Sequence, residues 1–175
     1  RVFALMGNHE HAHVGGAKVP KFHPDEAFVL ERALGPKDTE VLRALINSFP
    51  LVAVSPSGVV LTHAAPRGTE PNIEAFERLE YSGYEHLPPL HMADQGTLGA
   101  LLWARFATET QARSLLAGTA LTPGQPNRFV AFGHDVVPSG YERFSPSQIC
   151  VSSSFGLHDA DKRYLRLDLS ARYDN

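Results

Sequence analysis

Short apolar runs separated by polar and turn-forming residues predict the strands of this chain. Runs rich in Val, Ile, Phe and Leu, each bounded by Gly, Pro, Ser or a charged residue, favour buried strands. They lie at residues 1–6, 51–54, 59–62, 128–132, 148–154 and 163–169. The sequence SPSG between the second and third runs is typical of a tight turn, so these two strands are expected to form a hairpin.

Helical spacing of apolar residues predicts helices between these runs. The clearest case is DTEVLRALINSF, where Val41, Leu42, Leu45 and Ile46 fall on one helical face. Other helices are predicted at 24–34, 72–81, 96–106 and 108–118. Strands alternate with helices in the first half and strands dominate the last third, which is typical of an α/β fold with helices outside a mixed sheet. The length of 175 residues suits one domain over residues 1–175.

The composition argues against several classes of function but does not identify one. No uninterrupted apolar stretch reaches the ~18 residues of a membrane helix. The net charge is −3 and no run of Lys or Arg occurs, which argues against a nucleic-acid partner. The single cysteine, Cys150, cannot form a disulfide within the chain and fits a reducing compartment, so a cytoplasmic location is expected. Histidine is the unusual count, at nine residues.

Three histidines directly follow predicted strands. His9 follows the first run within Gly-Asn-His-Glu, His63 follows residues 59–62, and His134 follows residues 128–132 after Gly133. Ligands of α/β enzymes collect beyond the carboxyl ends of strands, where loops converge over a rigid sheet. Imidazole nitrogens with amide and carboxylate oxygens form a suitable shell for Mn, Fe, Zn or Ni. The alternative for each histidine alone is a loop side chain bonded to backbone; three at the same topological place favour a metal site.

The motifs in chain order resemble the calcineurin-like metallophosphoesterases, and within them the serine/threonine phosphoprotein phosphatases and their bacterial relatives. The similar segments are GNHE at 7–10, LTHAAP at 61–66, LLW at 101–103, FGHDVVPSGYE at 132–142 and ICVSSSFG at 149–156. Together they span nearly the whole chain in the order of that family. The resemblance implies a metallophosphoesterase-type β-sheet sandwich flanked by helices, and hydrolysis of phosphomonoesters with two divalent metal ions.

The resemblance also assigns roles to individual residues. It implies that Asn8, His63 and His134 ligate one metal ion, and that His9 donates a proton to the leaving oxygen without ligating. Glu10 corresponds to a residue that contacts the metal ligands without binding the metal itself. His11 and His13 have no place in the family pattern and are expected to be solvated loop side chains.

Two departures from the family pattern limit what this chain can do. The family's Asp-x-His and Gly-Asp-x-x-Asp-Arg-Gly motifs, which supply the first metal's ligands, would precede residue 1. The chain is therefore expected to be the C-terminal two-thirds of a domain, incomplete at its N-terminus and inactive alone. Where the branch has Trp-Ser-Asp-Pro, this chain has Trp103-Ala104-Arg105-Phe106. Arg105 and Arg128 are candidates for binding substrate phosphate, with solvated surface arginines as the alternative.

The sequence is compatible with more than one class of substrate. The first expectation is a phosphoserine or phosphothreonine protein, hydrolysed by a metal-dependent phosphatase. Within the same chemistry, a dinucleoside polyphosphate or another small phosphoester is the alternative, because Gly-Asn-His-Glu occurs there too. A catalytically inactive binding domain is the alternative of a different class. Neither a nucleic acid nor a membrane is expected as a partner.

Overall fold

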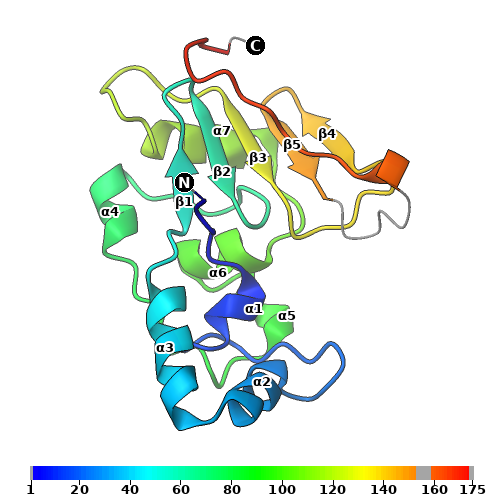
Figure 1. Cartoon of the computed structure of the whole chain (residues 1–175). Coiled ribbons are helices and arrows are strands. Elements are labelled where there is room, and N and C mark those ends of the chain that lie inside the picture. Colours follow the sequence, from blue (N-terminus) through cyan, green and yellow to red (C-terminus); the bar gives the residue numbers. More distant parts are fainter. Residues whose placement is uncertain (1, 153–158, 174–175) are drawn as a thin grey trace.

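A mixed five-stranded β-sheet forms the centre of the molecule in the computed structural model, which describes residues 2–152 and 159–173 (Figure 1). The strand order is β1-β2-β3-β5-β4. The strands are β1 (Val52–Val54), β2 (Val59–Thr62), β3 (Phe129–Phe132), β4 (Tyr141–Ser145) and β5 (Gln148–Val151). β2, β3 and β5 run parallel, and the two edge strands β1 and β4 run antiparallel to their neighbours. The α/β class is confirmed; the described residues form one sheet, and a second sheet of the expected sandwich is not among them.

Helices surround this sheet, and their ends follow from local sequence chemistry. The helices are α1 (Asn8–His11), α2 (Glu26–Leu34), α3 (Pro36–Asn47), α4 (Ile73–Glu77), α5 (Pro89–Met92), α6 (Gly96–Trp103) and α7 (Glu109–Gly118), with a 3-10 turn at Asp159–Asp161. Asp25 caps α2 by accepting from Phe28 N, and Gly35 ends it at φ 77°. Thr108 and Gln111 form a reciprocal capping box on α7. In Figure 1, α7 lies behind the sheet, and α1, α2, α3 and α5 gather beyond one end of it.

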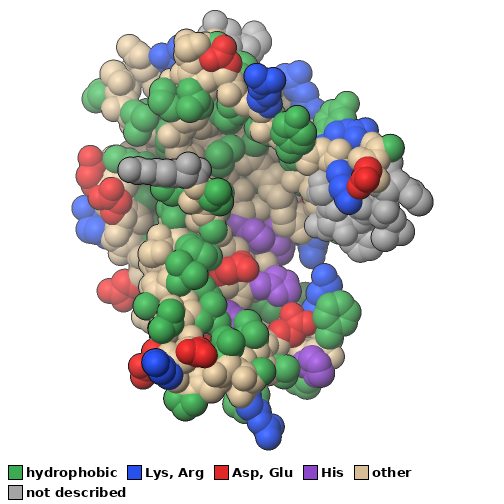
Figure 2. Space-filling view, viewed as in Figure 1, with side chains coloured by type: hydrophobic (Ala, Val, Ile, Leu, Met, Phe, Trp, Pro, Cys, Tyr) green, Lys and Arg blue, Asp and Glu red, His purple; other side chains and the backbone are tan. Residues whose placement is uncertain are grey.

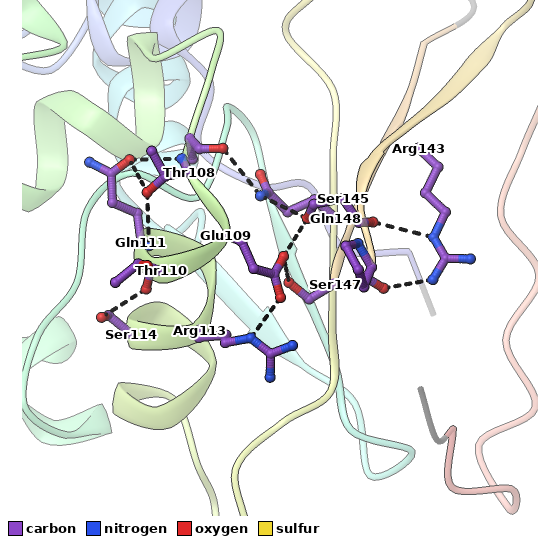
Figure 3. A network of polar contacts seen from close by, with 12 residues as sticks. Thr108, Glu109, Thr110, Gln111, Arg113, Ser114, Arg143, Ser145, Ser147 and Gln148 are labelled. Carbon is purple, nitrogen blue, oxygen red and sulfur yellow. Dashed lines mark hydrogen bonds and ion pairs between the residues drawn. The ribbon is translucent and has the colours of Figure 1, made fainter.

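The hydrophobic core lies between the sheet and helices α6 and α7. Leu98, Leu101 and Leu102 of α6 pack in one buried cluster with Val60 of β2 and Val130 of β3. A polar network ties α7 to the β4–β5 hairpin (Figure 3), because the Glu109 carboxylate accepts hydrogen bonds from the hydroxyls of Ser145 and Ser147. Two backbone hydrogen bonds join the segment after β2 to α6 and its C-cap, from Ala64 N to Leu101 O at 3.0 Å and from Ala65 N to Ala104 O at 2.8 Å. Among the described residues, none of the helices has the length and apolar character needed to span a membrane.

Two predicted strands are wrong. Residues 2–6 are not a strand: Met6 N donates to Pro50 O, but Val2 and Phe3 are 98% and 79% exposed and pair with no described strand. Residues 163–169 are also irregular and pair with no described strand. Figure 1 shows this C-terminal segment passing in front of the sheet.

The other predicted strands and helices are confirmed, with shifted ends. Strand β4 and the short helices α1 and α5 were not predicted, because YERFS is largely polar and NHEH and PLHM are each only about one turn long. The predicted strand 148–154 is confirmed for β5. Ser153 and Ser154 of this strand, and the first part of the loop at 155–162, lie outside the described residues.

Candidate functional site

Three polar side chains meet beyond the carboxyl ends of the parallel strands β2 and β3. His63 directly follows β2, and His134 follows β3 after Gly133, while Asn8 is the first residue of α1. His63 Nε2 lies 2.9 Å from Asn8 Oδ1 and 3.0 Å from His134 Nδ1. The two imidazole rings meet edge to face, with centroids 4.9 Å apart. The structure therefore brings together the three residues that the resemblance implied as ligands, from positions 55 and 71 residues apart.

The chemistry of this cluster fits a divalent cation. An amide oxygen only accepts, so the contact with Asn8 is a hydrogen bond when His63 Nε2 carries a proton. The same N–H also faces His134 Nδ1, so two acceptor lone pairs converge on one proton. Two ligands about 2.1 Å from a common ion, with bonds near a right angle, are about 3.0 Å apart. The observed distances of 2.9 and 3.0 Å are compatible with such a cation and equally with hydrogen bonds.

The donor set is smaller than a complete metal site. Within residues 2–152 and 159–173, no group of three His, Cys, Asp or Glu side chains is placed to hold a metal ion. The cluster has two imidazoles and one amide oxygen, and substrate or water oxygens would fill the other positions of an ion bound there.

Burial keeps both imidazoles of the cluster neutral. Burial is the main cause that lowers the pKa of His63 to about 3, and the nearby charges of His134 and His9 lower it further. Burial also lowers the pKa of His134 to about 4, with further lowering by Arg105 and a smaller opposing effect of Asp135. Neutral imidazole is the form that binds metals. Both side chains are thus ready to ligate at neutral pH.

These pKa values predict acid sensitivity of the metal-free protein. In the unfolded chain both imidazoles bind protons near pH 6.5, whereas in the folded chain they do so only near pH 3–4. Their contribution to stability is therefore complete above pH 6.5 and is lost as the pH falls below it. We expect the free energy of unfolding, measured by urea titration with a chelator present, to fall from pH 7.5 to 5. In His63→Gln the slope should be smaller by up to roughly 1.4 kcal/mol per pH unit. Identical slopes in both proteins would contradict this expectation.

The backbone of His134 is held in an uncommon conformation. Its φ is 64°, in the left-handed region, which costs a residue with a Cβ roughly 1–2 kcal/mol. Gly133 N donates to His63 O at 3.0 Å, which joins the two loops at the base of the cluster. Strain held in this way is typical of functional positions, where the surrounding structure over-determines the geometry. Here it aims the imidazole of His134 at His63.

Glu10 and His63 approach the same glycine. A Cβ built on Gly7 would lie 2.4 Å from Glu10 Oε2 and 3.1 Å from His63 Nδ1. Gly7 therefore leaves room for both side chains next to one another, on the side of the His63 ring that faces away from Asn8. The supporting role of Glu10 stays a prediction.

His9 lies beside the cluster and points elsewhere. Its Nδ1 is 3.3 Å from Glu26 Oε2, and 45% of its side chain is exposed. Electrostatic repulsion from His9 is among the causes that lower the pKa values of His63 and His134, so His9 lies within electrostatic reach of both. In Figure 2, histidine side chains gather beside acidic ones over the region that α1 occupies in Figure 1. This position suits a group that exchanges protons with a substrate bound at the cluster.

The two candidate arginines have different positions. Arg105 Nη1 donates to Asp135 Oδ1 at 2.6 Å, so its guanidinium lies next to His134. Arg128 precedes β3, whereas His134 lies beyond its other end, so the four residues of the strand, about 13 Å of extended chain, separate the two. The structure brings Arg105 to the cluster and leaves Arg128 at the opposite end of the sheet.

The prediction of solvated side chains for His11 and His13 is wrong. His11 is completely buried, and its Nε2 lies 2.6 Å from Tyr81 O. His13 Nδ1 lies 2.9 Å from Glu31 Oε1, with only 9% of its side chain exposed. Both histidines hold the loop after α1 in place, and neither contacts the cluster of Asn8, His63 and His134.

Sequence reasoning missed two residues of this region. Glu26 contacts His9, but it is 17 residues away on another helix, and no spacing rule connects them. Asp135, which holds Arg105, directly follows His134 in the Gly-His-Asp segment. The position of Asp135 directly after the candidate ligand His134 was therefore the only sequence signal for either of these two residues.

Comparisons with known proteins give little further information. No protein-family model matches the sequence, and no curated protein matches it. A structural comparison finds a protein serine/threonine phosphatase from Saccharomyces cerevisiae with similarity to human phosphatase PP5. The two share 13% sequence identity with a TM-score of 0.43, and the alignment covers 66% of this chain and 38% of that one. This chain thus spans less than half the length of that protein, and the proposed function rests on the side chains described above.

Proposed function

We propose that this chain carries one metal position and the proton-donating histidine of a metal-dependent phosphomonoester hydrolase acting on phosphoserine or phosphothreonine. The observation that carries the proposal is the meeting of Asn8, His63 and His134 within 3.0 Å at the ends of two parallel strands. The order of the Gly-Asn-His-Glu, His-Ala and Gly-His-Asp segments supports the same chemistry.

The described side chains would have separate roles in such a reaction. Asn8, His63 and His134 would hold a divalent ion, which neutralises phosphate charge when bound. Glu10 would orient the imidazole of His63 from its Nδ1 side. The guanidinium of Arg105, 62% exposed and directed by Asp135, would hydrogen-bond phosphate oxygens.

Proton transfer is the role proposed for His9. The alkoxide of serine or threonine is a poor leaving group and needs a proton as the ester bond breaks. His9 uses Nδ1 toward Glu26, so its Nε2 is the nitrogen available to give that proton. Histidine is the side chain that most often serves as a general acid in enzymes.

The proposed function is tested by turnover with defined substrates. The protein translated from the complete reading frame, loaded with Mn²⁺, should hydrolyse a phosphoserine or phosphothreonine peptide, and a chelator should stop the reaction. A diadenosine polyphosphate is the matched comparison, and faster hydrolysis of it would reassign the substrate class. Metal-loaded protein that hydrolyses neither substrate nor p-nitrophenyl phosphate would overturn the proposed function.

A further inference from the structure

The face of the sheet that looks away from α6 and α7 borders a cavity. Neighbouring residues of a strand point to opposite faces of its sheet. Val60 and Val130 lie in the buried cluster with α6, so Val59, Phe129 and Ala131 belong to the opposite face. The C-terminal segment passes in front of this face (Figure 1), and a cavity of about 260 Å³ lies between the two. Its apolar walls are formed by Val59, Phe129, Ala131, Ile149, Leu165 and Leu167.

The C-terminal segment forms the roof of this cavity and is fixed at one end. Tyr173 N donates to Ser57 O at 3.2 Å, and the Tyr173 hydroxyl accepts from Asp168 N at 2.7 Å. Within the described ranges of the chain, residues 164–167 make no hydrogen bond. This part of the roof can therefore shift to admit a ligand without breaking a hydrogen bond.

Two arginines from different elements line the same cavity. Arg143 of β4 donates from Nε to Ser145 O at 3.2 Å and from Nη2 to Pro146 O at 2.9 Å, so its Nη1 takes no part in these contacts (Figure 3). Arg166 belongs to the roof and has no hydrogen-bond or ion-pair partner within residues 2–152 and 159–173. None of the described residues that line the cavity is acidic. The cavity thus combines apolar walls with positive charge that no lining carboxylate neutralises.

From this lining we propose that the cavity binds a small amphiphilic anion, whose unbranched apolar chain lies against the sheet and whose anionic head group contacts Arg143 and Arg166. Pockets for small ligands typically have apolar walls and a few polar groups that fix the orientation of the ligand. Guanidinium groups bind carboxylate, sulfate and phosphate oxygens through charge-assisted hydrogen bonds. At about 30 Å³ for a group of the size of a methylene or a water, the cavity holds a chain of roughly eight carbons.

The cavity is separate from the cluster of Asn8, His63 and His134. Val59 and Phe129, which line the cavity, are the first residues of β2 and β3, whereas His63 and His134 lie beyond the carboxyl ends of the same strands. None of the three residues of the cluster lines the cavity. The inference is therefore independent of the proposed function, and its test needs no measurement of phosphoester hydrolysis.

Calorimetric titration of the protein from the complete reading frame with octanoate tests the proposal. We expect saturable binding of about one octanoate per chain. The affinity should fall about fourfold for each methylene removed, from octanoate to heptanoate and hexanoate, which is the usual contribution of one buried methylene. The uncharged 1-octanol should bind at least about 10-fold more weakly than octanoate, because it cannot form charge-assisted hydrogen bonds with the arginines. Octyl sulfate distinguishes the head groups: tighter binding than octanoate indicates a sulfate or phosphate ester and weaker binding a carboxylate, and both results support the site.

Two variants test the walls and the charge of the cavity separately. Ala131→Leu fills part of the cavity from the sheet, and Arg166→Gln removes the cation of the roof from an exposed position. Each should weaken octanoate binding at least about 10-fold. The matched control is Arg172→Gln on the same segment, because Arg172 donates to Gln125 Oε1 at 3.0 Å and does not line the cavity; this variant should bind octanoate like the wild type. Circular dichroism checks the fold of Ala131→Leu, and Arg166→Gln decides the question if that variant does not fold.

Three results would overturn the proposal. The first is the lack of saturable octanoate binding by the wild-type protein. The second is equal affinity for octanoate and 1-octanol, since the site would then not recognise an anion. The third is wild-type affinity for octanoate in Arg166→Gln, because the head group would then not lie at the roof.

Discussion

His134→Ala is expected to abolish divalent-metal binding by this chain. The substitution removes one of three lone pairs that converge within 3.0 Å, and the remaining Asn8 and His63 cannot hold an ion between them alone. Loss of residues that merely support a ligand lowers metal affinity by roughly 10- to 100-fold, so loss of a ligand should cost at least the upper value. Calorimetric titration with Mn²⁺ or Zn²⁺ should find about one ion per wild-type chain and none in the variant.

Two further variants separate metal ligation from folding. His134→Gly accepts the left-handed backbone at φ 64° without strain and carries no side-chain donor at the position of Nδ1. It should therefore fold like the wild type and still lose the ion. His86→Ala removes an exposed histidine outside the cluster and should bind metal normally. Unchanged metal content in His134→Ala would remove His134 from the proposed ligand set.

His9→Asn is expected to lower kcat on a phosphoserine peptide by roughly 10²- to 10⁴-fold, the usual contribution of general acid catalysis. The asparagine side chain cannot donate a proton to an alkoxide, whereas the imidazole of His9 can. The loss on p-nitrophenyl phosphate should be clearly smaller, because nitrophenolate leaves without protonation. Initial rates on both substrates, measured in the protein from the complete reading frame, give the comparison.

Metal content decides between proton transfer and ligation for His9. Its Nδ1 faces Glu26 and its side chain stands outside the contacts that join Asn8, His63 and His134. The His9→Asn protein should therefore bind the same amount of Mn²⁺ as the wild type. A large loss of metal in this variant, or equal losses of activity on the two substrates, would refute the role proposed for His9.

The sequence alone predicted those elements whose signals are local. Helix α2 is bounded by the Asp25 cap and by Gly35, and helix α7 by the Thr108 capping box, so both follow from side chains within a few residues of the ends. The β1–β2 hairpin follows from two apolar runs around a Ser-Pro-Ser-Gly turn. The placement of His63 and His134 after strands was also readable, because an apolar run ends directly before each of them.

Tertiary structure decided everything that depends on which segments become neighbours. Residues 2–6 and 163–169 have strand-like composition, but a strand also needs backbone hydrogen bonds to a neighbouring strand, and composition does not say which segments become neighbours. His11 and His13 have similar local sequences, yet the first is buried against Tyr81 and the second pairs with Glu31 of another helix. Arg105 and Arg128 look equally suitable in sequence, and only the direction of β3 places one near His134 and the other far from it. The contact of Glu26 with His9 arises because α2 packs against α1, and long-range packing of this kind leaves no periodic signal along the chain.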